Sequence, residues 1–84
     1  MKTLLIRGEG GIPPKVRDIV RAGSTELKEI RIDEERDSST LEADRVVLWN
    51  GGEIELRMDE TGTVTRLRWP EEEEKLRMFF QTGG

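Results

Sequence analysis

The feature that most constrains the fold is the start of the chain, where an apolar strand pattern gives way to a glycine loop and then to a helix pattern. Residues 2–7 form a short apolar run that predicts a buried strand. Residues 8–11, Gly-Glu-Gly-Gly, predict a loop. Pro13 and Pro14 suit a first helical turn, because the N–H groups of that turn have no helical partner in any case. A strand that reaches the next strand through a helix predicts a parallel pair with a right-handed crossover.

The helix that follows the glycine loop has a clear apolar face and a clear end. Val16, Ile19 and Val20 have the i, i+3, i+4 spacing that places three side chains on one side of a helix. Gly23 fits the position just after a helix. The segment from Leu27 to Ile32 then predicts a second strand, although a helix continued from residue 24 fits the same spacing.

The second half of the chain predicts an antiparallel meander followed by a helix. Residues 33–40 are polar and predict a loop, and residues 45–49 predict a buried strand. Asn50-Gly51-Gly52 is typical of a hairpin turn that requires positive φ angles. Alternation over residues 53–58 and 64–69 predicts two half-exposed strands on either side of a turn at 59–62. Pro70 at the first helical position, with the acids of 71–74 after it, predicts the start of a second helix.

These elements predict one small α/β domain over residues 1–84. The expected order is β-α-β-β-β-β-α, with a five-stranded mixed sheet, a C-terminal antiparallel meander and two helices. A chain of 84 residues is too short for two domains, since domains start near ~50 residues. A chain of this size also buries a modest share of its surface, so we expect a homo-oligomer to supply further burial.

Composition excludes several classes of function. The chain has no His, Cys or Tyr, so a Ser-His-Asp triad, a Cys-His pair and a thiolate metal site are all absent. We therefore expect no enzyme activity, no metal and no cofactor. The net charge of −4 argues against nucleic-acid binding, which relies on Lys and Arg to neutralise phosphates. No apolar run approaches the ~20 residues of a membrane span, and there is no signal-peptide pattern, so we expect a cytoplasmic location.

The first part of the chain resembles the N-terminal βαβ unit of Rossmann-type NAD(P)-binding domains, of the short-chain dehydrogenase and epimerase type. The strand Leu4-Leu5-Ile6, the loop of residues 8–11, the helix to Gly23 and the strand end at Asp33 carry the resemblance, and residues 43–52 are similar to a later strand and its loop. In that family an acid at the position of Asp33 binds a ribose hydroxyl. The resemblance implies a ligand or nucleotide crevice formed by Gly8, Gly10, Gly11, Asp33, Asn50 and Gly51.

The chain departs from this family at the positions that matter for its chemistry. Pro13 stands where the glycine motif has its third glycine. Pro13 and Pro14 also lack the N–H groups that a helix N-terminus offers to phosphate. The catalytic Tyr of the family has no counterpart, so dehydrogenase activity does not follow from the resemblance. A glycine-proline turn with a purely geometric role is the alternative.

The terminal helix suggests a different function. Four apolar side chains there cover more of the helix surface than one small sheet needs to bury, which is typical of a docking or dimer surface: Leu76, Met78, Phe79 and Phe80. We therefore expect a non-enzymatic protein-interaction or regulatory module that binds itself or a protein partner. Gly83-Gly84 leaves a further alternative, a diglycine-terminated ubiquitin-like or sulfur carrier. On the meander, Arg57, Arg66 and Arg68 should share a face with Glu53 and Glu55 and form cross-strand ion pairs with them.

Overall fold

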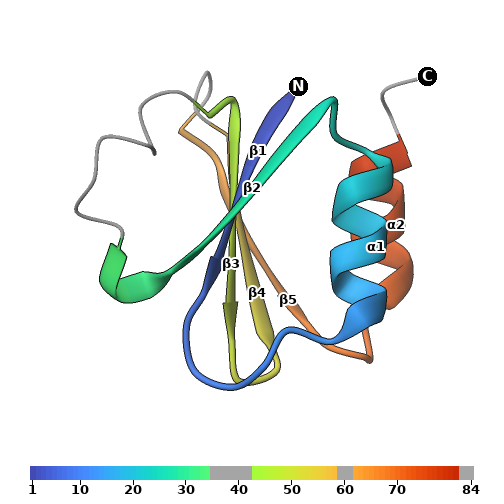
Figure 1. The fold of residues 1–84 in the computed structure, drawn as a ribbon. Coiled ribbons are helices and arrows are strands. Elements are labelled where there is room, and N and C mark those ends of the chain that lie inside the picture. Colours follow the sequence, from blue (N-terminus) through green and yellow to red (C-terminus); the bar gives the residue numbers. More distant parts are fainter. Residues whose placement is uncertain (35–42, 59–61, 82–84) are drawn as a thin grey trace.

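A single five-stranded sheet organises the molecule (Figure 1). The structure is a computed structural model that describes residues 1–34, 43–58 and 62–81. The elements in chain order are β1 (Lys2–Arg7), α1 (Pro14–Ala22), β2 (Glu26–Arg31), the 3-10 helix η1 (Ile32–Glu34), β3 (Arg45–Asn50), β4 (Glu53–Met58), β5 (Val64–Arg68) and α2 (Glu73–Gln81). The predicted α/β class and the predicted order of strands and helices are confirmed.

The strand order is β2-β1-β3-β4-β5. The inner strand β1 lies parallel to β2 on one side and to β3 on the other. The strands β3, β4 and β5 form the predicted antiparallel meander. The segment after residue 24 is therefore a strand, and the alternative of a continued helix is wrong. The predicted loop at 33–40 and the predicted turn at 59–62 lie largely outside the described residues.

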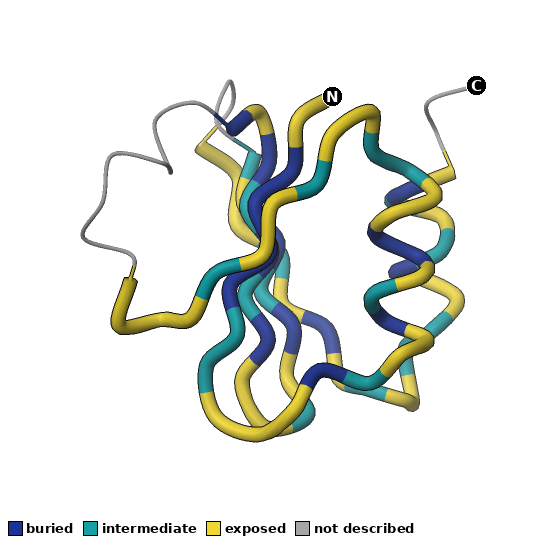
Figure 2. Tube along the Cα trace, in the orientation of Figure 1, coloured by how far each residue is buried: buried dark blue, intermediate teal, exposed yellow. Residues whose placement is uncertain are grey.

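Both helices lie on the same face of the sheet (Figure 1). The buried residues of the sheet and of the helices face each other across this layer (Figure 2). The predicted apolar face of α1 is confirmed, because Val16, Ile19 and Val20 are all buried. They pack with strand residues such as Leu5 and Val47 in one apolar cluster.

The other face of the sheet has a smaller apolar cluster. It contains Leu4 and Ile6 of β1, which are almost fully buried, together with Ala43. Because side chains alternate along a strand, β1 sends Leu5 to the helix side and its neighbours to this side. A central strand buried on both faces explains why the N-terminal run is continuously apolar rather than alternating.

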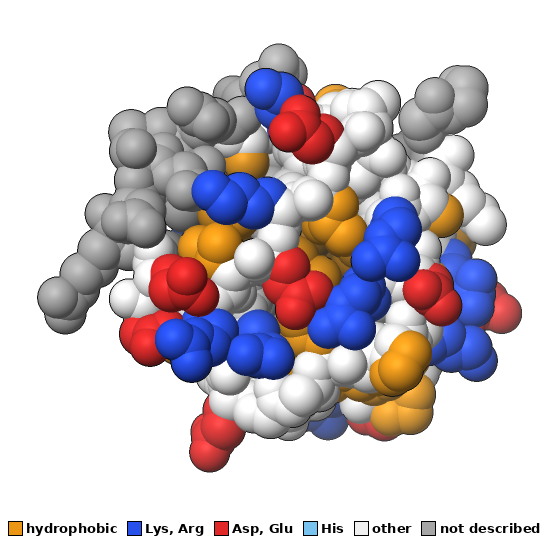
Figure 3. All heavy atoms as spheres, viewed as in Figure 1, with side chains coloured by type: hydrophobic (Ala, Val, Ile, Leu, Met, Phe, Trp, Pro, Cys, Tyr) orange, Lys and Arg blue, Asp and Glu red, His pale blue; other side chains and the backbone are white. Residues whose placement is uncertain are grey.

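The outer strand β2 is charged rather than apolar. Seen with β2 in front, the surface intersperses Lys and Arg with Asp and Glu (Figure 3). Arg17 of α1 donates two hydrogen bonds to the carboxylate of Glu29, of 2.8 and 3.1 Å, and so ties α1 to β2. Charges on an edge strand disfavour pairing with a strand of another chain.

The turn between β3 and β4 uses the predicted glycines. Gly51 and Gly52 have φ angles of 55° and 98°, in the left-handed region that favours glycine. This confirms the hairpin that Asn50-Gly51-Gly52 predicted.

Gly23 ends α1 as predicted, but its backbone does not need glycine. Its φ is −96°, which any residue can adopt. A Cβ at this position would instead lie 2.6 Å from the Cβ of Phe80 and closer still to the Phe80 carbonyl oxygen. Glycine is therefore required here because α2 approaches the end of α1 very closely.

We expect Gly23→Ala to lower the free energy of unfolding by about 1–3 kcal/mol, since an overpacked contact must be relieved by backbone movement. Urea denaturation measures the effect. Gly11→Ala is the matched control, because a Cβ there would meet nothing within 4 Å. Equal stability of the two variants would contradict the close approach.

The second helix begins later than predicted. We expected Pro70 at the first helical position, but α2 begins at Glu73. The preceding residues form turns, in which Glu72 N–H donates to Arg68 O over 2.8 Å and Glu73 N–H donates to Pro70 O over 3.1 Å. The carboxylate of Glu72 accepts a hydrogen bond from the backbone N–H of Arg68 over 2.8 Å. It thereby satisfies this N–H at the end of edge strand β5. Within the described residues, neither helix is long and apolar enough to cross a bilayer.

This carboxylate should make stability depend on pH. The hydrogen bond from Arg68 N–H, and then the bond from Lys75, lower the pKa of Glu72. A lowered pKa in the folded state stabilises the fold above the unfolded value of about 4.3, and this contribution is lost as pH falls through the folded pKa. We expect Glu72→Gln to be less stable than the wild type at pH 7 and to lose that difference at acidic pH. Glu71→Gln is the charge-matched control, and a Glu72→Gln deficit that persisted at low pH would contradict the expectation.

Candidate functional site

The proposed docking surface on α2 is mostly buried. Leu76 is 0% exposed and Phe80 is 5% exposed, because the i, i+4 stripe of the helix faces the sheet. These two residues belong to the core, and their assignment to an interface is wrong. Met78, at 65% exposure, faces outward, and Phe79 is half-buried. The predicted four-residue surface therefore reduces to Met78 and part of Phe79.

The glycine loops adjoin as expected, since β1 and β3 are neighbours. Gly8 N–H donates to Trp49 O over 2.7 Å, and Gly51 N–H donates to Glu9 O over 2.8 Å. The side-chain oxygen of Asn50 accepts the N–H of Glu9 over 3.1 Å. These bonds join the two loops to each other. They also use three backbone N–H groups that a phosphate would need.

Asp33 lies beside the glycine loop but is engaged elsewhere. It lines a hollow of about 470 Å³ with Gly8, Gly10 and Gly11, whereas Asn50 and Gly51 do not line it. An oxygen of Asp33 is 3.6 Å from Nε of Arg31, and both side chains are well exposed. The structure therefore brings together four of the six residues of the predicted crevice, in a surface hollow with paired charges.

Among the described residues Arg68 forms no ion pair with Glu53, and the predicted ion pairs on the meander are present only at Glu55. One of its oxygens is 3.3 Å from Arg57 and the other is 4.0 Å from Arg66. Both arginines are substantially exposed, so these pairs stabilise the fold weakly. They also leave this face with charges that compensate each other.

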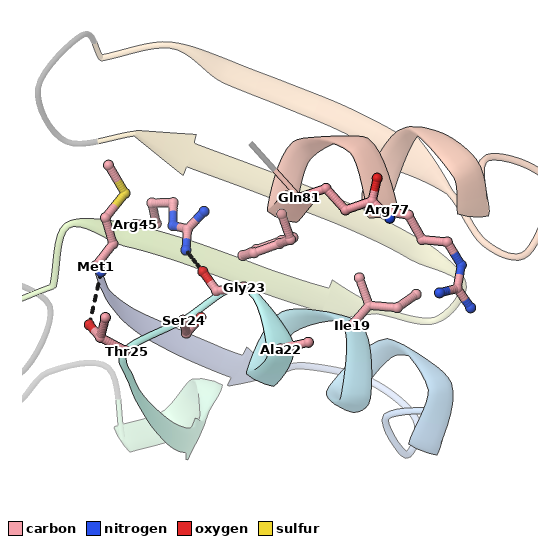
Figure 4. Close-up of a pocket in the computed structure, with 10 residues that line it drawn as sticks. Met1, Ile19, Ala22, Gly23, Ser24, Thr25, Arg45, Arg77 and Gln81 are labelled. Atoms are coloured by element: carbon pink, nitrogen blue, oxygen red, sulfur yellow. Dashed lines mark hydrogen bonds between the residues drawn. The ribbon is translucent and has the colours of Figure 1, made fainter. Parts of the chain in front are cut away.

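A better-formed cavity lies at the opposite end of β1 from the glycine loop. It has a volume of about 640 Å³ and lies where α1 ends, where α2 ends and where β3 begins (Figure 4). It is lined by Met1, Ile19, Ala22, Gly23, Ser24, Thr25, Arg45, Arg77, Phe80 and Gln81. This volume is within the ~300–1,000 Å³ of small-molecule sites.

Arg45 is the central side chain of this cavity. It is the first residue of β3 and is only 6% exposed. Its Nη2 donates a hydrogen bond to the carbonyl oxygen of Gly23, at the C-terminal end of α1 (Figure 4). Its guanidinium carbon lies 4.5 Å from the centre of the Phe80 ring. A cation is favourable both at a helix C-terminus and over an aromatic face, so these contacts hold the guanidinium in place.

The guanidinium of Arg45 is nevertheless incompletely satisfied. Its Nε is buried and has no hydrogen-bond partner. No described carboxylate forms an ion pair with Arg45. Burial lowers the pKa of Arg45, and the nearby charge of Asp44 acts in the opposite direction. Removing a cation from water without pairing it with an anion is unfavourable.

The rest of the lining is apolar or already hydrogen-bonded. Arg77 is held by Glu73 at 2.9 Å. The amino group of Met1 donates to Oγ1 of Thr25 over 2.8 Å. Ile19, Ala22 and the Phe80 ring supply apolar wall. The cavity thus offers one buried cation without a described carboxylate partner, Arg45, beside an apolar surface, with the exposed amino group of Met1 as a second positive group.

Comparison with protein-family models, with curated proteins and with solved structures found no match to this chain. The site is therefore described from its own geometry, and the likeness of the first βαβ unit to NAD(P)-binding domains stays a resemblance.

Sequence reasoning missed the Arg45 cavity, although the sequence contains a signal for it. Arg45, Val47 and Trp49 alternate along β3 and must share one face. Val47 and Trp49 are apolar, which predicts that this face of the strand is buried. An arginine is unusual on a buried face. Gly23 and Phe80 reach this arginine because the two helices pack together. No local sequence pattern predicts that packing.

Proposed function

We propose that this chain is a non-enzymatic binding module that takes a small anionic ligand in the cavity around Arg45. The observation that carries the proposal is the buried guanidinium, which has a cavity beside it and no described carboxylate paired with it. A ligand anion would supply the missing partner. Charge-assisted hydrogen bonds of this kind are among the strongest in proteins.

The charge of the lining supports an anionic ligand. The whole chain has a net charge of −4, with 18 acidic residues. None of the acidic residues that the structure describes lines the cavity, whereas two arginines do. A local positive site on a negative chain fits a negatively charged ligand of limited size, which can reach the cavity without docking against the acidic surface.

The chemistry of the lining supports binding rather than catalysis. Arginine stays protonated in proteins and does not serve as a general acid or base near neutral pH. The other polar side chains of the described lining are hydroxyls and an amide, and no histidine or carboxylate stands among them as a general base. The site can hold and orient an anion, and this is the function we propose.

Titration of the ¹⁵N-labelled protein with small carboxylates and with inorganic phosphate, at constant ionic strength, tests the proposal by NMR. We expect saturable shifts of backbone signals around the cavity, at Ile19, Ser24 and Gln81. The signals of Gly10 and Gly11, at the other end of β1, serve as the internal control and should not move. Saturable shifts confined to the glycine loop would favour the nucleotide crevice and contradict the proposal.

Protein interaction or self-association remains a second proposal, favoured by the outer edge of β5. This strand is last in the sheet order, and Val64 at its start is 50% exposed. Among the described residues, the Glu72 carboxylate accepts the N–H of Arg68 at the end of β5. Native mass spectrometry at micromolar concentration tests it: a dimer lost in Val64→Asp would support it, and a bare monomer would contradict self-association. The diglycine of the carrier alternative lies outside the described residues.

A further inference from the structure

We propose that the ligand of the Arg45 cavity is a monocarboxylate with an apolar body, such as an aryl or short alkyl acid. This inference rests on the proposed function and names the class of ligand. It follows from three features of the cavity. These are the charges without a carboxylate partner, the guanidinium nitrogens of Arg45 without a hydrogen bond, and the apolar side chains of the wall.

The charges of the described lining favour a ligand with one negative charge. Arg77 is 2.9 Å from Glu73, so its charge is already compensated. The amino group of Met1 lies at the solvent-exposed side of the cavity, on Thr25. Arg45 remains as the buried charge without a carboxylate partner. A carboxylate neutralises this buried charge, whereas the second charge of a phosphate dianion would have only the exposed amino group of Met1 as an unpaired cation in the described lining.

The surroundings of the guanidinium match a planar anion. The guanidinium carbon of Arg45 lies over the Phe80 ring, 4.5 Å from its centre. Nη2 donates to Gly23, and Nη1 has no hydrogen bond to another described residue. This leaves the edge of the guanidinium plane that carries Nη1 for an anion. A planar carboxylate suits this edge-on approach, because guanidinium and carboxylate pair in a common plane.

The walls of the cavity match an apolar body. Ile19 and Ala22 line the cavity from α1 (Figure 4), and Phe80 lines it from α2. The volume of about 640 Å³ is far larger than a single carboxylate needs. Burying an apolar group there adds affinity in proportion to the area removed from water. Acetate alone would leave most of this wall exposed.

Isothermal titration calorimetry with four sodium salts tests the class: phenylacetate, hexanoate, acetate and phosphate, at one pH and one ionic strength. We expect phenylacetate and hexanoate to bind at least about tenfold more tightly than acetate, because each buried methylene contributes a factor of about four. Phosphate should bind no more tightly than acetate. Ala22→Leu, which adds bulk to the apolar wall from an exposed helix position, should weaken phenylacetate binding several-fold and leave acetate binding nearly unchanged.

The outcomes separate this inference from the function beneath it. Phosphate binding more tightly than every carboxylate would overturn the monocarboxylate class and leave an anion site in place. Equal affinity of acetate and phenylacetate, in the wild type and in Ala22→Leu, would overturn the apolar body. No saturable heat with any of the four salts would overturn the proposed function as well. A urea denaturation curve for Ala22→Leu that matches the wild type shows that altered binding does not come from unfolding.

Discussion

Replacing Phe80 with alanine is expected to lower the free energy of unfolding by about 3–5 kcal/mol, the usual cost of truncating a buried aromatic side chain. Phe80 is 5% exposed and packs in the main core cluster. Its ring also supports the Arg45 guanidinium, so the variant loses a cation–π contact along with packing. The total stability of a domain this size is about 4–13 kcal/mol. The variant should therefore lose a large part of its stability and unfold at a clearly lower urea concentration than the wild type, as measured by urea denaturation followed by circular dichroism.

Met78→Ala is the matched control for this prediction. It truncates a large apolar side chain on the same helix, but Met78 is 65% exposed. We expect a change within about 0.5 kcal/mol, as for surface substitutions in general. If Phe80→Ala kept its stability and changed only the oligomeric state, Phe80 would be an interface residue and the burial of this side of α2 would be contradicted.

Replacing Arg45 with glutamine is expected to weaken phenylacetate binding about 10- to 150-fold. This range corresponds to the loss of a hydrogen bond to a charged group, about 1.5–3 kcal/mol. Glutamine keeps an N–H donor that can reach toward Gly23 but removes the charge. Calorimetry with phenylacetate measures the loss of affinity, and a urea curve shows whether the variant is folded.

Arg21→Gln is the control for charge in the Arg45 experiment. Arg21 is an exposed arginine in the last turn of α1, close to the cavity but not part of its lining. We expect a change in affinity below about threefold, because exposed charges are screened by salt and water. Equal losses in Arg21→Gln and Arg45→Gln would indicate a long-range charge effect and contradict a specific role for Arg45.

The strands and the first helix could be predicted because their signals are local. Alternation along β4 and β5, the glycines of the turn at 51–52 and the spacing of Val16 with Ile19 each depend on residues close in sequence. The parallel pairing of β1 with β2 followed from the helical connection between them, whereas the parallel pairing of β1 with β3 was not predicted. These rules need no knowledge of how the helices pack.

The errors came from features that tertiary packing decides. The Pro-Glu pattern after Trp69 suits a helix start and also suits the turns that the chain forms there, so α2 was predicted to begin too early. The apolar stripe of α2 is wide enough for an interface, but Leu76 and Phe80 fill the space beside α1 instead. Gly23 was explained by backbone conformation, whereas the contact with Phe80 requires it.

The candidate site was predicted poorly for the same reason. The glycine crevice relied on one contiguous stretch, and the structure uses its N–H groups to join the loops. The Arg45 cavity combines residues from both helices, from β3 and from the chain start, which are far apart in sequence. A buried arginine can be anticipated from strand alternation, but the cavity beside it cannot.

The most direct test of the account is the NMR signal of the Arg45 side chain during titration with phenylacetate. Arg45→Gln identifies the Nε–Hε signal of Arg45 among those of the ten arginines by its disappearance. We predict that this signal shifts saturably with the same dissociation constant as the backbone signals around the cavity. A side-chain signal that stays in place while phenylacetate binds elsewhere on the protein would contradict the Arg45 site.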